Sequence, residues 1–330
     1  MKLSDIARLA QVSVTTASYV INGQAAQRRI SPATVERVLA VVEQHGYLPD
    51  QQAAGLRRGQ SRCLGFILPD LENPSYARLA KLLEQGARAA GYQLLIASSD
   101  DDPASERQLL ELFRSRRCDA LIVASCLPQD DPLYRNLVEG GLPVIAVDRA
   151  LDPAYIRSVV SDDQLAGAQL TASLLAPPPR HIALIDAYSA LPISQARERG
   201  FHQALAGFDG IVSVHHAEQF SRACGCQQMR ALLDSAERPD AVVTTSYVLL
   251  EGVFEALRDY PAETFSELRL ATFGDAQLLD FVPLRVNTIA QQFDRIAERV
   301  LDRSLRAIEG DYQPGVEAIP RTLKIRREQP

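Results

Sequence analysis

The sequence predicts an α/β protein with two doubly wound parallel-sheet lobes, preceded by a small all-α headpiece with a helix-turn-helix. Three observations support this prediction. The first 48 residues carry three short helical patterns and no strand pattern. After residue 60, short apolar runs alternate with helical patterns, which is typical of parallel sheets covered by helices. These units are too many for one ordinary sheet, so two lobes fit better.

Capping residues and apolar spacing predict the first two helices. Ser4 is a suitable N-cap for the first helix. A turn at residues 11–12 follows, and Ser13 is a suitable N-cap for the second helix. The side chains expected to face the headpiece core are Ile6, Leu9, Ala10, Ala17, Val20 and Ile21. The opposite face of the second helix is small, hydroxyl-rich and uncharged, and consists of Val14, Thr15, Thr16, Ser18, Tyr19 and Asn22. Such a face suits the major groove, where hydroxyls meet base edges and short apolar groups contact thymine methyls.

A third helix completes the headpiece. Ser31 and Pro32 open it and Gly46 ends it. Its expected core face consists of Val35, Val38, Leu39 and Val42. Residues 1–48 therefore predict a helix-turn-helix DNA-binding domain. An ordinary three-helix bundle is the alternative, and the order, the lengths and the outward face all favour the DNA-reading arrangement.

Residues 49–60 predict a hinge. The segment from Gln51 to Arg58 allows only about two helical turns, too few to be stable alone in water. Leu56 beside Arg57 and Arg58 fits a minor-groove wedge, in which leucine unstacks a base step and the arginines lie near phosphates. A flexible linker is the alternative interpretation.

Residues 61–330 predict the core. The expected strands are residues 63–68, 93–97, 120–125, 144–147, 181–185, 211–214, 241–245 and 270–273. We assign about residues 61–160 and 292–320 to the first lobe, and about 161–291 and 321–330 to the second. In open α/β sheets ligands bind beyond the carboxyl ends of strands, so the cleft between the lobes is the expected site.

Charge is distributed unevenly between the two parts. Residues 1–60 hold seven Lys and Arg against four Asp and Glu, a net charge of +3, so the remainder carries −9 of the total of −6. A basic headpiece on an acidic body confines phosphate attraction to the headpiece. The sequence shows no signal peptide and no apolar run of membrane length, so we expect a cytoplasmic protein without membrane contact.

No metal, cofactor or enzymatic centre is predicted. The five cysteines lack paired zinc-site spacing, and reduced thiols are expected. A metal set of His215, His216, Glu218, Cys224 and Cys226 is irregular in spacing, and adjacent histidines on a strand point to opposite faces. The sequence contains no nucleophile elbow, P-loop or dinucleotide fingerprint, so the chain is not expected to be an enzyme.

Polar residues that follow the strand ends form the candidate ligand site. Carboxylates and carboxamides suit vicinal hydroxyls, whereas the planar guanidinium groups of Arg149 and Arg197 fit phosphate oxygens. This chemistry is that of a sugar phosphate. The candidate effector-binding residues are Asn73, Ser75, Tyr76, Asp148, Arg149, Arg197, Ser246, Tyr247, Asp275, Gln291 and Arg321.

Several segments carry a resemblance to the lactose-repressor family of transcription factors. These are residues 1–7 (MKLSDIA), Val12-Ser13, Thr16-Ala17-Ser18, Val20-Ile21-Asn22, Tyr47, Pro49, Ala53 and Leu56. The segments at residues 15–23, 69–73 and 271–275 resemble the fructose-repressor branch of this family. The resemblance implies two lobes of the periplasmic-binding-protein type and a regulator that binds DNA as a homodimer.

The resemblance also implies partners and roles. Asp148, Arg197 and Asp275 would hold the effector, Arg149 and Arg321 would add phosphate contacts, and fructose 1-phosphate is the implied ligand. A near-palindromic double-stranded operator is the other partner. The expected DNA contacts are Ser4, Val14, Thr15, Thr16, Ser18, Tyr19, Asn22, Arg29, Tyr47, Ala53, Leu56 and Arg57.

Alternatives remain at this point. A purine-responsive or free-sugar-responsive member of the same family is the main rival, and a transport receptor shares the two-lobe core but has no use for a headpiece. The charged tail lacks leucine heptads, so no tetramerising coiled coil is predicted, while tetramers through another surface stay open. We expect effector closure of the cleft to separate the hinges and lower operator affinity.

Overall fold

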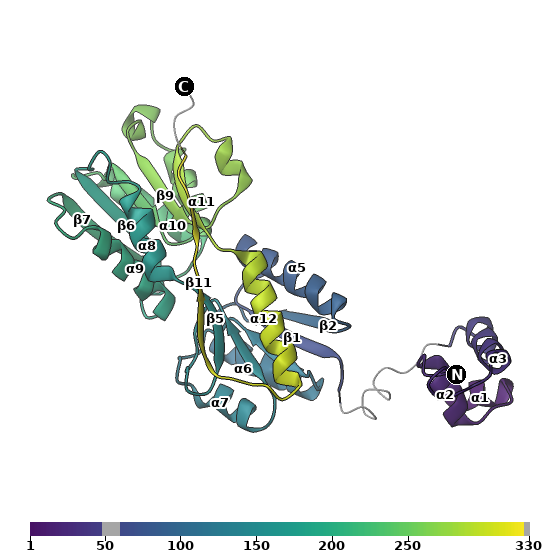
Figure 1. The fold of residues 1–330 in the computed structure, drawn as a ribbon. Coiled ribbons are helices and arrows are strands. Elements are labelled where there is room, and N and C mark those ends of the chain that lie inside the picture. The colour runs from purple at the N-terminus through teal and green to yellow at the C-terminus, as the bar shows by residue number, and fades with distance from the viewer. Residues whose placement is uncertain (48–59, 327–330) are drawn as a thin grey trace. The chain divides into compact units, whose positions relative to one another are not determined.

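The structure is a computed structural model that describes residues 1–47 and 60–326. Contacts within the chain divide it into two compact units, Met1–Arg62 and Cys63–Pro330. All eight predicted strands occur among the described residues, together with four further ones at residues 157–161, 286–290, 315–319 and 322–324, and the two largely parallel sheets behind a helical N-terminal unit confirm the predicted fold class. Figure 1 shows the helical N-terminal unit and the two sheets of the second unit.

Three helices make up the N-terminal unit, namely α1 (Leu3–Leu9), α2 (Val14–Ile21) and α3 (Pro32–Gln44). Ser13 and Ser31 cap α2 and α3 as predicted, because each side chain accepts a backbone N–H in the first turn of its helix. The predicted cap at Ser4 is wrong. Helix α1 begins two residues earlier with Lys2 as its N-cap, and the Asp5 carboxylate accepts the Lys2 backbone N–H at 2.9 Å.

A small apolar cluster holds the headpiece together, and its buried members are Ile6, Ala10, Val20 and Val38. Two predicted core residues are exposed instead, Leu9 at 42% and Leu39 at 47%. Such short helices around a small core bury only a narrow stripe of each surface, so leucines at the edge of the stripe remain in solvent.

The first sheet of the core has the strand order β11-β5-β4-β3-β1-β2, and all its neighbours pair in parallel. Its strands are β1 (Cys63–Leu68), β2 (Gln93–Ser98), β3 (Ala120–Val123), β4 (Val144–Val147), β5 (Arg157–Ser161) and β11 (Gly315–Ile319). The helices of this lobe are α5 (Pro74–Ala89), α6 (Pro103–Ser115), α7 (Pro132–Glu139) and α12 (Phe293–Ile308). Apolar side chains on both faces of the sheet are buried against these helices.

The second sheet has the order β12-β10-β9-β8-β6-β7, and only its edge strand β12 runs antiparallel to its neighbour. Its strands are β6 (His181–Ala187), β7 (Ile211–Ala217), β8 (Ala241–Thr244), β9 (Arg269–Phe273), β10 (Val286–Ala290) and β12 (Thr322–Lys324). The helices of this lobe are α8 (Asp163–Ala172), α9 (Pro192–Ala204), α10 (Arg222–Asp234) and α11 (Tyr247–Leu257), with short 3₁₀ turns at Ala262–Phe265 and Gln277–Asp280.

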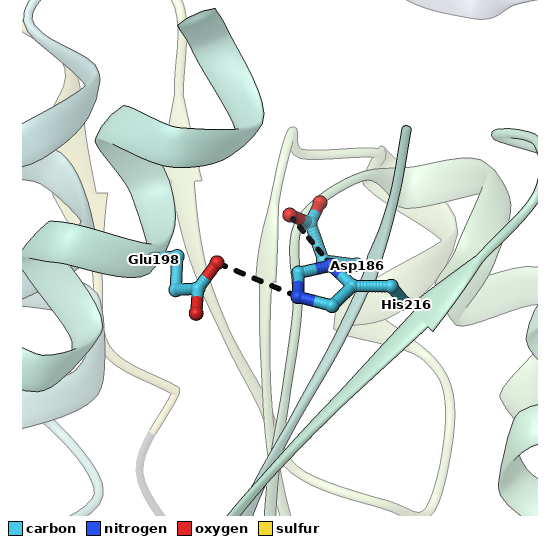
Figure 2. Close-up of side chains that lie close together, drawn as sticks. All are labelled: Asp186, Glu198 and His216. Carbon is cyan, nitrogen blue, oxygen red and sulfur yellow. Dashed lines mark ion pairs between the residues drawn. The ribbon is translucent and has the colours of Figure 1, made fainter. Parts of the chain in front are cut away.

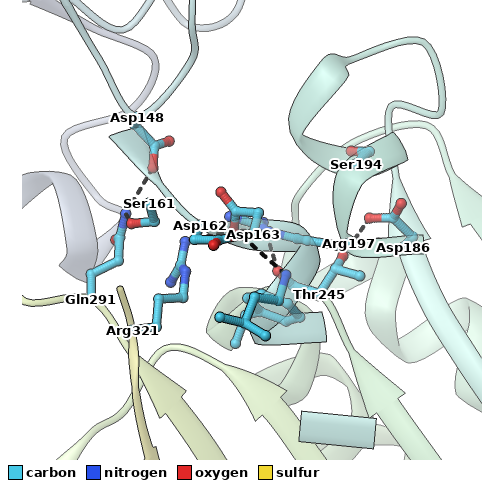
Figure 3. Close-up of polar contacts among 12 residues, drawn as sticks. Asp148, Ser161, Asp162, Asp163, Asp186, Ser194, Arg197, Thr245, Gln291 and Arg321 are labelled. Atoms are coloured by element: carbon cyan, nitrogen blue, oxygen red, sulfur yellow. Dashed lines mark hydrogen bonds and ion pairs between the residues drawn. The ribbon is translucent and has the colours of Figure 1, made fainter. Parts of the chain in front are cut away.

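The chain passes between the two sheets three times, between β5 and α8, between β10 and α12, and between β11 and β12. These crossings bring Ser161, Gln291 and Arg321 to the junction of the lobes, where Figure 3 shows them together. All five cysteines are unbridged. Among the described residues, none of the helices combines the length and the apolar character needed to cross a lipid bilayer.

Candidate functional site

A cavity lies at the carboxyl ends of the strands, between the two lobes, and opens to solvent; its unfilled space, open solvent included, is about 880 Å³. The lining comes from both sheets and from the crossings: Asn73, Ser75, Tyr76, Asp101, Asp148, Arg149, Ile193, Arg197, Phe220, Thr245, Ser246, Tyr247, Phe273, Gln291 and Arg321 are among its residues.

The amino end of α5 forms part of the first-lobe wall. Asn73 is its N-cap and Pro74 its first residue, and the Asn73 carboxamide oxygen accepts the backbone N–H of Ser75 at 3.0 Å. This oxygen is therefore already occupied in satisfying the helix. Tyr76, one position further on, donates its hydroxyl to Asp148 Oδ2 at 2.7 Å.

Asp148 follows β4 directly, with φ at +66°. This left-handed conformation turns its carboxylate toward the cavity, where Gln291 donates to the other carboxylate oxygen at 2.8 Å. Burial raises the pKa of Asp148, but the charges of Arg197 and Arg321 outweigh burial and the net pKa lies below the ordinary value. The cavity therefore holds an ionised carboxylate at neutral pH.

Arg149 is only 8% exposed and forms a bidentate pair with Asp101, at 2.5 and 3.3 Å. Burial disfavours its charge, yet the pKa of Arg149 is raised because Tyr76 and Asp101 lie close. Its Nε atom is buried and has no hydrogen-bond partner. A buried donor without an acceptor is costly, which indicates a position for a bound acceptor.

Arg197 on α9 and Arg321 at the third crossing point toward the same carboxylate oxygen, Oδ1 of Asp163, each at 2.9 Å. Both guanidinium groups also lie against the ring of Phe273, at 4.7 and 5.2 Å from its centre. Figure 3 shows these arginines converging from different segments. Burial and the neighbouring charge of Arg197 lower the pKa of Arg321, and the Nε atom of Arg321 is a second buried donor without a partner.

Most of the predicted effector residues do meet in this cavity. Ten of them line it: Asn73, Ser75, Tyr76, Asp148, Arg149, Arg197, Ser246, Tyr247, Gln291 and Arg321. The exception is Asp275, which is absent from the described lining. Its carboxylate instead accepts from Arg326 at 2.6 Å and from Thr288 at 3.1 Å, so it belongs to an ion-pair cluster at the edge of the second sheet.

Three residues with clear roles escaped sequence reasoning: Asp101, Asp163 and Thr245. Asp101 lies just past the end of β2, and the polar residues after this strand are not in the candidate set. Asp163 follows β5, which was not predicted because this strand is short and begins with an arginine. Thr245 accepts from Arg197 through its backbone carbonyl at 2.8 Å, which no sequence signal indicates.

The predicted DNA-reading face lies on α2. Val14, Thr15 and Asn22 are exposed, whereas Thr16 bonds to the cap residue Ser13 and Tyr19 stacks beneath the Arg28 guanidinium at 4.7 Å. The other predicted contacts divide into three groups. Ser4 and Arg29 are exposed and Ser18 is partly buried, Tyr47 packs against the headpiece core, and Ala53, Leu56 and Arg57 lie outside the described residues.

Both units match known family models. Residues 2–50 match the model for bacterial regulatory proteins of the lacI family, and residues 61–257 match the model for periplasmic binding proteins and the sugar-binding domain of the LacI family. The chain belongs to the LacI family of DNA-binding bacterial regulators, which are not enzymes.

Relatives within the family are close. The fructose operon regulatory protein of Vibrio cholerae is 49% identical over 326 residues, which cover 99% of this chain and 100% of the relative. The catabolite repressor/activator of Escherichia coli is 42% identical over 325 residues, or 98% of this chain and 97% of the relative. This agreement confirms the resemblance to the fructose-repressor branch.

Solved structures agree with the fold. The Cra transcriptional dual regulator from Pseudomonas putida, solved in complex with fructose 1-phosphate, is 60% identical with a TM-score of 0.79, and the match covers 81% of this chain and 99% of that one. The operator-bound Lac repressor dimer is 21% identical with a TM-score of 0.82 and covers 99% of this chain and 98% of that one. At that identity it supports the fold alone.

Proposed function

We propose that this chain is a cytoplasmic transcriptional regulator of fructose or central carbon metabolism, and that fructose 1-phosphate releases it from its operator. The observation that carries the proposal is the set of three buried arginines around one cavity, two of which hold an unpartnered Nε–H. A phosphate group supplies both negative charge and several acceptor oxygens, so it meets both requirements of the cavity.

The rest of the cavity suits a sugar. Asp148 and Gln291 present an acceptor and a carboxamide close together, which is the arrangement that binds neighbouring hydroxyls. Phe273 and Tyr247 add apolar surface on the second-lobe side. A relative named for the fructose operon, and a 60% identical structure solved with fructose 1-phosphate, support the same ligand.

On the DNA side, we propose that a homodimer binds a near-palindromic operator through α2 of each headpiece. The exposed, uncharged surface of α2 supports this role. The predicted hinge contacts at Leu56 and Arg57 extend the proposal to the minor groove. Closure of the two lobes around the effector would then change the spacing of the headpieces in the dimer and lower operator affinity.

Calorimetric titration of the full chain tests the effector. We expect fructose 1-phosphate to bind at least about tenfold more tightly than fructose, because charge-assisted hydrogen bonds contribute about 1.5–3 kcal/mol each. Fructose 1,6-bisphosphate serves as the second comparator. Equal binding of fructose and its phosphate would contradict the role of the arginines. Binding of purines alone would favour the rival effector class.

An arginine variant assigns the result to this cavity. We expect Arg197→Ala to lose the effector response while it retains binding to a selected operator duplex. Arg199→Ala is the matched control, because this exposed arginine lies two residues further along the same helix. A normal effector response in Arg197→Ala would place the effector site elsewhere.

A further inference from the structure

Three side chains behind the effector cavity form a cluster that the proposed function does not use. Asp186 at the end of β6 and His216 on β7 are direct partners in the parallel register, so both point to the sheet face covered by α9. Glu198 reaches them from α9 (Figure 2). One potential ligand atom from each residue lies within 4.8 Å of the other two.

Distances show that the histidine stands between two carboxylates. His216 Nε2 lies 3.5 Å from Glu198 Oε2, and His216 Nδ1 lies 3.9 Å from Asp186 Oδ2. His216 and Glu198 keep 34% and 29% of their side chains exposed, so the cluster opens to solvent on one side. This opening gives a small solute an entry path.

The Asp186 carboxylate supplies a second, independent observation. The residue is fully buried, and one of its oxygens accepts the Thr245 hydroxyl. The other oxygen, Oδ2, is buried without any hydrogen-bond partner and faces His216. Arg197 does not fill this position, because its described hydrogen bonds go to Asp163 and to the Thr245 carbonyl. A buried carboxylate oxygen without a donor is stabilised by a cation.

We propose that Asp186, Glu198 and His216 bind a divalent transition-metal ion of the first row, such as Mn²⁺ or Zn²⁺. One imidazole nitrogen and two carboxylate oxygens are the ligand types these ions accept, whereas Mg²⁺ and Ca²⁺ prefer sets made of oxygen alone. Three protein ligands leave further positions for water on the exposed side.

The site differs from the set considered in the sequence. His215 points to the opposite face of β7, where it lies 3.0 Å from the Ser213 hydroxyl, as expected for neighbours on a strand. The proposed ligands come from two strands and a helix instead, with the carboxylates of Asp186 and Glu198 contributed by residues far from His216 in sequence. Sequence spacing alone does not reveal such a set.

The proposed metal site lies next to residues that line the effector cavity. Thr245 donates its hydroxyl to Asp186 and accepts from Arg197 through its carbonyl, and Glu198 directly follows Arg197 on α9. A bound cation would therefore hold the ends of β6 and β7 against α9, next to the helix that carries an effector arginine.

Electron paramagnetic resonance of Mn²⁺ tests the proposal on the full chain after chelator treatment. Mn²⁺ is chosen because it has little affinity for the five thiols. We expect the wild-type protein to remove about one equivalent of free Mn²⁺ signal. His216→Gln and Glu198→Gln should each weaken Mn²⁺ binding by at least about tenfold, because replacing a residue that supports a metal site typically lowers metal affinity by about that factor or more.

Two kinds of control show whether a loss of Mn²⁺ binding comes from the proposed ligands. His215→Gln removes the neighbouring histidine on the opposite face and should bind Mn²⁺ like the wild type. Circular dichroism and operator binding confirm that each variant is folded, and both are independent of the effector proposal. No Mn²⁺ uptake by the wild type at millimolar concentration, or equal uptake by wild type and His216→Gln, would overturn the site.

Discussion

The two walls of the effector cavity balance their charges differently. On the first-lobe wall, Arg149 has its own carboxylate in Asp101, and the further carboxylate of Asp148 lies close by. On the second-lobe wall, Arg197 and Arg321 share one oxygen of Asp163. The first wall therefore has at least one acid for each arginine, whereas the second has two guanidinium groups for one paired carboxylate.

This difference separates the two requirements of a sugar-phosphate site. A wall with excess carboxylate presents acceptors to hydroxyls, and a wall with excess guanidinium attracts an anion. The second wall is also fragile, because Asp163 alone forms ion pairs with both of its buried guanidinium groups. The Asp163 carboxylate is therefore expected to contribute more to the stability of the protein than the Asp101 carboxylate.

The largest expected effect follows from removing the shared carboxylate. Asp163→Asn should lower the free energy of unfolding by about 3–5 kcal/mol, because it leaves two buried guanidinium groups without their paired charge. Asp101→Asn should cost about 1 kcal/mol, since Asp101 is more exposed, at 17% against 6%, and Arg149 keeps a bond to the Ser125 carbonyl. Urea unfolding of the two variants measures the difference.

Urea unfolding of both variants at one fixed concentration of effector sharpens this comparison. Added fructose 1-phosphate should recover part of the stability lost in Asp163→Asn, because its phosphate supplies negative charge to the same arginines. Equal losses in the two variants would show that the two walls are equivalent, contrary to the charge count.

The two walls also differ in how many of their residues can be predicted from the sequence. Strand ends are readable from apolar runs, so the sequence predicts Asp148 and Ser246 for the cavity, and the structure places them there. Asp163 follows a strand without a clear apolar signature, and its pairing with Arg321 spans 158 residues. Such a partner depends on how the three crossings bring the segments together.

Asp275 is the predicted effector residue that the described cavity lining does not include. It lies two residues past the end of β9 and has suitable chemistry, so both the strand-end rule and the family resemblance favour it. The edge strand β12 and the residues after it bring Lys324 and Arg326 beside it, and these cations form ion pairs with its carboxylate. A strand-end rule does not include competition from a neighbouring strand.

A smaller effect is expected from pH. Effector affinity should fall by about tenfold between pH 7 and pH 5, because a phosphate monoester with a second pKa near 6 loses most of its second charge over this range. The lowered pKa of Asp148 keeps this carboxylate ionised throughout. Calorimetry at several pH values measures the change, and a sulfate ester of the sugar, which keeps its charge, should bind with no such dependence.

Protein stability should follow a different pH course. The pKa of Asp148 is lower in the folded state than its unfolded value of about 3.9, so its stabilising contribution is complete above the unfolded value. It is lost as the pH falls through the lower folded pKa. Loss of stability from this group between pH 5 and pH 7 would contradict the lowered pKa.

The smallest expected effect concerns the first wall alone. Tyr76→Phe removes the donor to Asp148 Oδ2 but leaves the Gln291 bond to the other oxygen. Because Asp148 is only partly buried, water can replace the hydroxyl, and we expect a loss of about 1 kcal/mol in unfolding free energy. Tyr188→Phe is the control, since this ring packs against Phe220. A loss in Tyr76→Phe as large as that in Asp163→Asn would mean that the first wall, too, depends on one polar contact, and the distinction between the walls would fail.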